Sequence, residues 1–390
     1  MRPRPNRIER LPEQYFTSLL ARVAAVAAEP GEPLIDLGRG NPDVPPPAHI
    51  VDALVESARE QTSAVHGYAP FAGLPELREA IAERYANVYG VELDPHREVA
   101  VVPGTKSALV EVALCVAGPG DAIALPDPGY PDFRSAVALA GAEHMPLPLD
   151  DAGRPEWDAL TRKPALVYLN YPSNPTGASA PDGVFGEAVA LADWTEGSVL
   201  HDFAYGDLVF DGRTPRSFLA EPGAREVGVE LFSLSKSYGM AGWRLGFVLG
   251  NEELVARVSW LQEHVRAGIF VALQRAAIAA LTGPQETVAE RKALYEARRD
   301  RVFAALPTLS PRCEGTFFVW LQLPDGWSCE RLLQEARVAL APGEGFGVRG
   351  RGRARLSLAV SDETLDAGLE RIQQALNRGN LERPPDVLPT

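Results

Sequence analysis

The 390-residue chain lacks the cysteine pattern, the long apolar runs and the basic stretches that mark several classes of protein. Its three cysteines, Cys115, Cys313 and Cys329, share no metal-ligand spacing and are odd in number, so neither a metal site nor a disulfide framework is expected. They are typical of free thiols in a reducing compartment, which predicts a cytoplasmic protein. No run approaches 18 apolar residues, so no membrane span or membrane partner is expected.

The charge balance argues against a nucleic-acid partner. The chain has 38 basic and 52 acidic residues, a net charge of −14, and no long basic run. The arginines at 349, 351, 353 and 355 are interleaved with glycine inside an acidic protein. The N-terminal segment FTSLLARVAAVAAEP is interrupted by Arg22 and has helical spacing, which predicts an amphipathic helix and not a signal peptide.

The chain is predicted to form an α/β fold with two domains. Apolar residues make up 46% and charged residues 23%, which is typical of a globular protein. Between about residues 48 and 250, near-continuous apolar runs such as DAIALPDPG, ALVYLN and VELFSLS alternate with helical patterns, so we expect a mostly parallel mixed sheet flanked by helices. Residues 46–285 are expected to form this large domain. Residues 1–45 and 286–390 are expected to form a smaller α+β domain.

Ligands of open α/β sheets bind beyond the carboxyl ends of the strands, so polar residues that follow apolar runs are candidates. Gly104-Thr105-Lys106-Ser107 follows EVAVVP and opens a helix, where free backbone N–H groups can bind an anion. The stretch NYPSNPTG, which contains Asn174, follows ALVYL, and its two prolines hold the loop rigid. Taken alone, the first motif is also compatible with an ordinary helix cap, and the second with an ordinary turn.

Two further candidates follow the next apolar runs. Asp202 closes the run SVLH and is followed by Tyr205, and a buried carboxylate there needs a cation or hydrogen-bond donors. Lys236 follows VELFSLS, where burial would lower its pKa and make it nucleophilic. Arg244 is a permanent cation suited to phosphate. Taken alone, Asp202 could be a helix N-cap and Lys236 a surface lysine.

Together these elements match one cofactor, pyridoxal 5′-phosphate. Its phosphate needs an anion site, for which Gly104 to Ser107, Ser233, Ser235 and Arg244 are candidates. Its phenolate oxygen and protonated ring nitrogen need an amide or phenol and a carboxylate, and its aldehyde needs a lysine. Asn174, Tyr205, Asp202 and Lys236 supply these groups.

The sequence resembles the class I/II aminotransferases of the fold type I pyridoxal-phosphate enzymes across nearly its whole length. SNPTG, HDFAYGDL and SLSKSYGMAGWRLGF match the best-known motifs of that family. LGRGNPDVPPP, HGYAPFAGLPELREAIA and PDPGYPDF resemble the branch of LL-diaminopimelate and alanine aminotransferase-type enzymes. The resemblance implies transfer of an amino group between an L-amino acid and a 2-oxo acid.

The resemblance also implies residue roles. Lys236 would form the internal aldimine and carry the α-proton, Asp202 would pair with the ring nitrogen, and Asn174 and Tyr205 would contact the ring oxygen. By the same resemblance, Tyr130 would contact the ring face, and Arg355 and Gly40 would contact the substrate carboxylate. The residues that would contact the phosphate are Thr105, Lys106, Ser233, Ser235 and Arg244. Tyr68 would contact the phosphate of the neighbouring subunit in a homodimer.

Some positions depart from the family pattern and leave the substrate open. Arg353 stands where the branch often has an aromatic residue, and LGRGN introduces Arg39 and Asn41. In QEHVRAGIFVALQ, Arg266 and Val271 stand where an acidic or small residue and a glutamine are expected. The same cofactor residues would also serve a lyase, replacement enzyme, cyclase or oxidase on this fold. A non-catalytic regulatory or binding domain is a further alternative, which the intact lysine disfavours.

Overall fold

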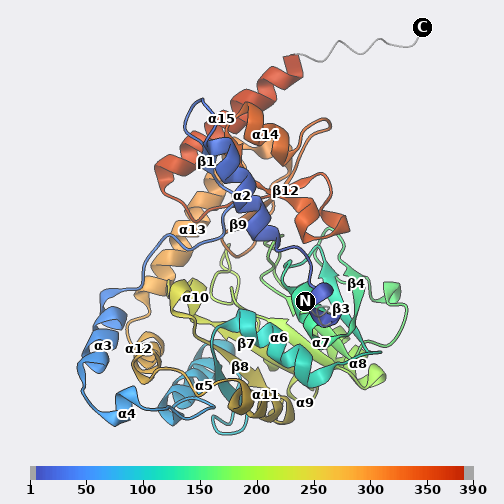
Figure 1. Ribbon diagram of the computed structural model, residues 1–390. Helices are drawn as coiled ribbons and strands as arrows, with labels where there is room; N and C mark the ends of the chain where they lie inside the picture. Colours follow the sequence, from blue (N-terminus) through green and yellow to red (C-terminus); the bar gives the residue numbers. More distant parts are fainter. Residues whose placement is uncertain (1–5, 382–390) are drawn as a thin grey trace, which may run out of the picture.

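The computed structural model describes residues 6–381 and has a seven-stranded sheet at its centre (Figure 1). The strand order is β2-β8-β7-β6-β5-β3-β4, in which only β8 runs antiparallel to its neighbours. The strands are β2 Val99–Val102, β3 Ala122–Asp127, β4 Glu143–Pro148, β5 Leu166–Asn170, β6 Ser198–Asp202, β7 Gly228–Ser233 and β8 Gly246–Gly250. The predicted α/β class with a mostly parallel mixed sheet is confirmed.

Helices cover both faces of this sheet, which explains the near-continuous apolar strands. One face packs against α5 Pro75–Tyr89, α8 Val184–Thr195 and α12 Val271–Thr282. The other packs against α6 Thr105–Val116, α7 Phe133–Ala140 and α11 Glu252–Val265. Edge strand β4 was not predicted, because its sequence EHMPLP is partly exposed and has no continuous apolar run. We call these residues the large part.

A second core lies at the other end of the molecule and forms what we call the small part (Figure 1). Its three-stranded sheet has the order β11-β12-β9, and β1 pairs with β10 beside it. The strands are β1 Ile35–Asp36, β9 Phe318–Gln322, β10 Val338–Ala339, β11 Ala341–Pro342 and β12 Arg353–Ser357. The helices are α13 Glu286–Ala305, α14 Cys329–Glu335 and α15 Asp362–Leu381.

The predicted N-terminal amphipathic helix is present as α2, Tyr15–Ala27. Its Val23 and Val26 pack on the small part against Leu333 and Ala339, and the helix extends toward the large part (Figure 1). The remaining helices are short or peripheral: α1 Asn6–Glu9, α3 Ala48–Arg59, α4 Ser63–His66, α9 Ala224–Val227 and α10 Leu234–Ser237.

The two-domain division at residues 45/46 and 285/286 stays a prediction, although α13 begins at Glu286. Among residues 6–381, no helix is both long and apolar enough to cross a membrane.

Candidate active site

A cavity of about 430 Å³ opens at the carboxyl ends of the central strands, where the sequence places its candidates. Asp202 ends β6, Ser233 ends β7, and Lys236 lies on the short helix α10 that follows directly. Twelve of the predicted residues line this cavity: Gly40, Thr105, Lys106, Tyr130, Asn174, Asp202, Tyr205, Ser233, Ser235, Lys236, Arg244 and Arg355. The fold therefore brings together motifs that are up to 315 residues apart in sequence, from Gly40 to Arg355.

Lys236 is a half-buried amine without a polar partner in the described chain. Its Nζ lies 5.2 Å from the ring centre of Phe317 and 5.7 Å from that of Tyr205. Burial, together with the positive charges of Arg355 and Arg244, lowers the pKa of Lys236 to about 8. The neutral amine, which a nucleophile or proton acceptor requires, is therefore a minor form at pH 7 and becomes the major form above about pH 8.

Asp202 is a buried carboxylate with few donors around it. The backbone N–H of Ala204 donates to its Oδ1 at 3.3 Å, and burial raises the pKa of Asp202 to about 6. Burial also raises the pKa of the nearby Tyr205 hydroxyl, which makes no hydrogen bond to another described residue. A carboxylate in this setting gains from a cationic partner, because the partner offsets its lost hydration.

The opposite end of the cavity is built to hold an anion. Gly104 precedes α6 with a φ of +85°, and a Cβ there would collide with the Arg244 guanidinium. Glycine therefore lets Arg244 lie against the N-terminus of α6. Arg244 donates to the carbonyl of Ala241 at 2.9 Å and has no carboxylate partner in the described chain. The Ser233 hydroxyl accepts from the N–H of Ser235 at 3.1 Å and borders the same space. Backbone N–H groups, hydroxyls and a guanidinium together suit a phosphate.

Arg355 is a buried cation that has no counter-ion among residues 6–381. The residue is only 1% exposed, and burial lowers its pKa to about 10. Its Nη1 donates to Asn174 Oδ1 at 2.8 Å and its Nη2 to the carbonyl of Gly38 at 3.0 Å, while its Nε has no partner. The Phe318 ring lies 3.8 Å from the guanidinium carbon. An anion entering the cavity would compensate this charge.

Three predicted residues stand apart from the cavity or have other partners. Tyr68 is 91% exposed and does not line the cavity within one chain. Gly104 acts through its contact with Arg244 and is not itself in the cavity wall. Lys106 lines the cavity, but its Nζ forms an ion pair with Asp132 Oδ2 at 2.8 Å.

Asn170 is a site residue to which the sequence reasoning assigned no role. Its Nδ2 donates to the carbonyl of Asp202 at 2.8 Å, and its Oδ1 accepts from the N–H of Asn174 at 2.8 Å. Asn174 in turn holds Arg355. Asn170 therefore links three parts of the site. It ends the apolar run ALVYLN, so the rule that found Asp202 could also have found it.

Helix α2 was predicted as a helix but not as part of the site. Phe16, Leu19, Leu20 and Val23 all line the cavity. The helix is held there by Tyr15, whose hydroxyl donates to the carbonyl of Pro342 at 2.8 Å. No local signal in the sequence shows that an amphipathic helix will close a site formed by distant residues.

The residues present fit pyridoxal phosphate on the chemistry of their free groups. Within the part of the chain that the structure describes, Lys236 has an unpartnered amine, Asp202 a buried carboxylate without an ion-paired cation, and Arg244 a guanidinium without an anion. These are the groups that the aldehyde, the ring nitrogen and the phosphate of the cofactor require.

Comparisons with known proteins agree with this chemistry. Residues 32–372 match the family model described as aminotransferase class I and II. The L-glutamine–4-(methylsulfanyl)-2-oxobutanoate aminotransferase of Bacillus subtilis is 43% identical, over 94% of each chain. The LL-diaminopimelate aminotransferase of Moorella thermoacetica is 39% identical, over 96% of this chain and 98% of its own. The structure of apo-BacF from Bacillus subtilis superposes with a TM-score of 0.90 at 38% identity, over 96% and 98% of the two chains.

Proposed function

Because the chain belongs to the class I and II aminotransferases and depends on pyridoxal 5′-phosphate, we propose that Lys236, Asp202 and Arg355 organise its active site. The observation that carries this proposal is the arrangement of three incompletely compensated groups around one cavity: a neutralisable amine, a buried carboxylate and a buried guanidinium. Lyase, replacement, cyclase or oxidase chemistry is not favoured, since the similar relatives are named as aminotransferases or transaminases.

When bound, the cofactor supplies an aldehyde that condenses with amines and a ring that withdraws electrons from the substrate α-carbon. Arg355 binds the substrate α-carboxylate, assisted by Asn174, and thereby orients the α-hydrogen. The neutral amine of Lys236 would accept that α-proton at Nζ. It would then donate the proton to a carbon of the cofactor. Asp202 stays ionised beside a cationic ring nitrogen, because the partner charge offsets its burial.

The arrangement of side chains around the cavity also supports the remaining predicted contacts. Thr105, Ser233, Ser235 and Arg244 would hold the phosphate, and Tyr205 and Asn174 would donate hydrogen bonds to the ring oxygen. Tyr130 packs on the ring face, and Gly40 leaves room beside Arg355, because a Cβ there would meet Phe318 Cζ at 2.8 Å. We assign Lys106 to the phosphate end through its place in the first turn of α6, since its amine already pairs with Asp132.

The apolar wall contributed by α2 supports an amino acid with an apolar side chain as substrate. Leu19, Leu20 and Val23 face the cavity, and Leu20 is 42% exposed in the described chain. A bound apolar side chain would bury this surface, and burial of apolar surface contributes a favourable free energy of about 25 cal/mol per Å². The two relatives above are named for an apolar methylsulfanyl oxo acid and for the charged diaminopimelate. The wall favours the first kind of side chain.

A cytoplasmic homodimer is supported by two sets of residues. Tyr68 stands out from the surface with 91% of the residue exposed, so a second copy could cover it. The three cysteines are free, which suits a reducing compartment. We propose a role in amino acid metabolism.

The assignment of Lys236 is tested by Lys236→Ala. We expect purified wild-type protein to acquire visible absorbance on binding pyridoxal phosphate, and the variant to lack it. Lys163→Ala is the matched control, because Lys163 is an exposed lysine on the carbonyl of Trp194, outside the cavity. Retention of the absorbance by Lys236→Ala would refute the assignment. Release of ammonia from an amino acid, without conversion of the cofactor to its amine form, would refute transamination.

A further inference from the structure

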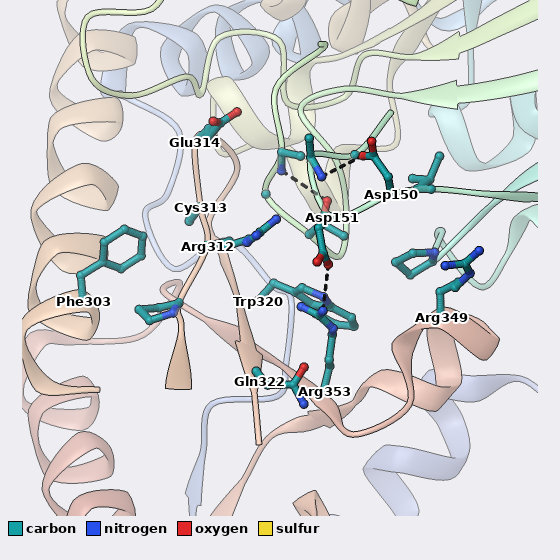
Figure 2. Close-up of a pocket in the computed structure, with 18 of the residues that line it drawn as sticks. Asp150, Asp151, Phe303, Arg312, Cys313, Glu314, Trp320, Gln322, Arg349 and Arg353 are labelled. Carbon is teal, nitrogen blue, oxygen red and sulfur yellow. Dashed lines mark hydrogen bonds and ion pairs between the residues drawn. The ribbon is translucent and has the colours of Figure 1, made fainter. Parts of the chain in front are cut away.

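A second and larger cavity, of about 850 Å³, lies between the large and small parts (Figure 2). It shares no lining residue with the proposed active site. Asn174 faces the active site while Thr176, Gly177 and Ala178 face this second cavity, so their loop lies between the two spaces. Its volume lies within the range of about 300–1,000 Å³ that is typical of small-molecule sites, which often form between domains.

Both parts of the molecule supply walls of this cavity. The large part contributes the loop with Asp150 and Asp151, and the small part contributes Arg312 and Trp320, which pair as a β-bridge (Figure 2). Two ion pairs join the parts at its rim: Arg353 Nη2 to Asp151 Oδ1 at 3.0 Å, and Arg349 Nη2 to Glu156 Oε2 at 2.9 Å. These contacts shape a cavity that depends on the relative position of the two parts.

The charges that line the cavity are unevenly compensated. Each lining carboxylate accepts from a guanidinium or a backbone N–H: Asp150, Asp151, Asp211, Glu156 and Glu314. Arg213, Arg349 and Arg353 are used in such pairs. The guanidiniums of Arg312 and Arg351, in contrast, make no hydrogen bond or ion pair with any other residue of the described chain. The cavity therefore presents two solvent-exposed guanidiniums whose donors are not used by other described residues, while Asp150 accepts only from backbone N–H groups.

Arg312 occupies a central position in this arrangement. Figure 2 shows its side chain extending from the small part into the cavity, toward the loop of Asp150 and Asp151. The Trp320 ring lies below it and gives the cavity an aromatic floor (Figure 2). A planar guanidinium binds carboxylate or phosphate oxygens through two parallel hydrogen bonds, which are stronger than neutral ones.

We propose that this cavity between the two parts binds a small organic anion with at least two negatively charged oxygen groups, held by Arg312 and Arg351. The shared chemistry is that of a polycarboxylate or a phosphate ester of a short carbon frame. Both arginines belong to the small part, and the bound anion would lie beside the loop of Thr176, Gly177 and Ala178 of the large part. The proposal is independent of the amino-group chemistry, because the site lies outside the cofactor cavity and uses none of its residues.

The test is titration of the pyridoxal-phosphate-loaded protein with citrate and, separately, with glycerol 3-phosphate. Ionic strength is held constant with KCl, since exposed charges are screened over about 10 Å at 0.1 M salt. We expect calorimetry to give one site per chain for at least one probe, and thermal unfolding to move to higher temperature. Binding of citrate alone identifies a polycarboxylate site, and binding of glycerol 3-phosphate alone identifies a phosphate-ester site.

Arg312→Gln and Arg351→Gln are expected to weaken that binding at least about 10-fold each, through loss of a charge-assisted pair. Neither side chain makes a hydrogen bond within the described chain, so both variants should fold. Arg59→Gln is the matched control, because Arg59 at the end of α3 is another exposed arginine whose side chain makes no hydrogen bond or ion pair with a described residue. The proposal is overturned if neither probe binds beyond the KCl control, if both cavity variants bind like wild type, or if binding depends on Arg355 and not on Arg312.

Discussion

At the scale of single residues, the surroundings of Lys236 determine when its amine can react. Burial and the neighbouring positive charges of Arg355 and Arg244 lower the pKa of this lysine to about 8 from an ordinary value of 10.5. The charged form is disfavoured in this environment, while the negative charge of Asp202 opposes the shift. The neutral, nucleophilic fraction therefore increases as the pH rises through about 8.

We predict that the apoprotein reacts with added pyridoxal phosphate at a rate that rises with pH and has a midpoint near 8. Stopped-flow absorbance between pH 6 and 10 measures this rate, and a free lysine derivative serves as the reference amine. A midpoint near that of the free amine would show that the folded chain does not lower the pKa of Lys236.

Asn170 shows how one buried amide can position several functional groups. Asn170→Ala removes its hydrogen bonds to Asp202 and to Asn174, each at 2.8 Å, and Asn174 carries the contact to Arg355. We expect kcat/KM to fall about 10- to 100-fold, since each lost buried hydrogen bond costs about 1–2 kcal/mol. The KM for the amino acid should rise, and the absorbance maximum of the bound cofactor should shift.

The matched control for this substitution is Asn251→Ala. Asn251 also makes several hydrogen bonds, to Arg225, Glu226 and Leu254, but it caps α11 outside the cavity. Its loss should reduce the free energy of unfolding by about 1 kcal/mol and leave the kinetics and the absorbance unchanged. Equal effects of the two substitutions would mean that Asn170 is only a structural residue.

At the scale of elements, α2 lies outside the seven-stranded sheet and still supplies an apolar wall of the cavity. Its inner face carries Val23 on the small part and Leu19 and Leu20 toward the cavity. The same amphipathic pattern thus serves both packing and, as proposed, recognition of an apolar side chain.

Leu20→Ser tests that role of the helix. We expect kcat/KM for methionine or leucine to fall about 10-fold, because the substrate side chain loses apolar contact area, while the value for alanine stays within about twofold. Val51→Ser is the control, since Val51 is also partly exposed but lies on α3 outside the cavity. An equal loss for alanine would contradict the proposal, as would a wild-type preference for diaminopimelate or aspartate.

At the scale of the whole molecule, the site of one chain lacks the residue that the family resemblance assigns to a partner. Tyr68 is 91% exposed and does not line the cavity of its own chain. A dimer in which each copy completes the other would explain this position.

Subunit mixing tests this arrangement. We expect a native mass of about twice the chain mass of 42.0 kDa. Mixing Lys236→Ala with Tyr68→Ala should restore activity above that of either variant, since the mixed dimer contains one intact site. Mixing Lys236→Ala with Asp202→Asn should restore none, because both residues belong to the same site. A monomeric mass, or equal results for the two mixtures, would rule out shared sites.

The sequence alone determined the fold class, the family and most of the cavity wall. Long apolar strands, each followed by a polar residue, predict an α/β sheet with its ligands at one edge, and this holds because parallel strands end together. Asp202, Ser233 and Lys236 were found by that rule. Edge strand β4 and the linking role of Asn170 were not found, since the first has little apolar signal and the second acts through contacts.

Only the tertiary structure decided which distant surfaces meet. It placed α2 over the cofactor cavity, left Arg355 without a counter-ion among the described residues, and brought the exposed Arg312 to the cavity between the two parts. Local sequence patterns report which face of an element is buried, because burial follows the period of the helix or strand. They carry no information about the opposing element, since apolar packing is non-directional and is settled by the shape of the whole chain.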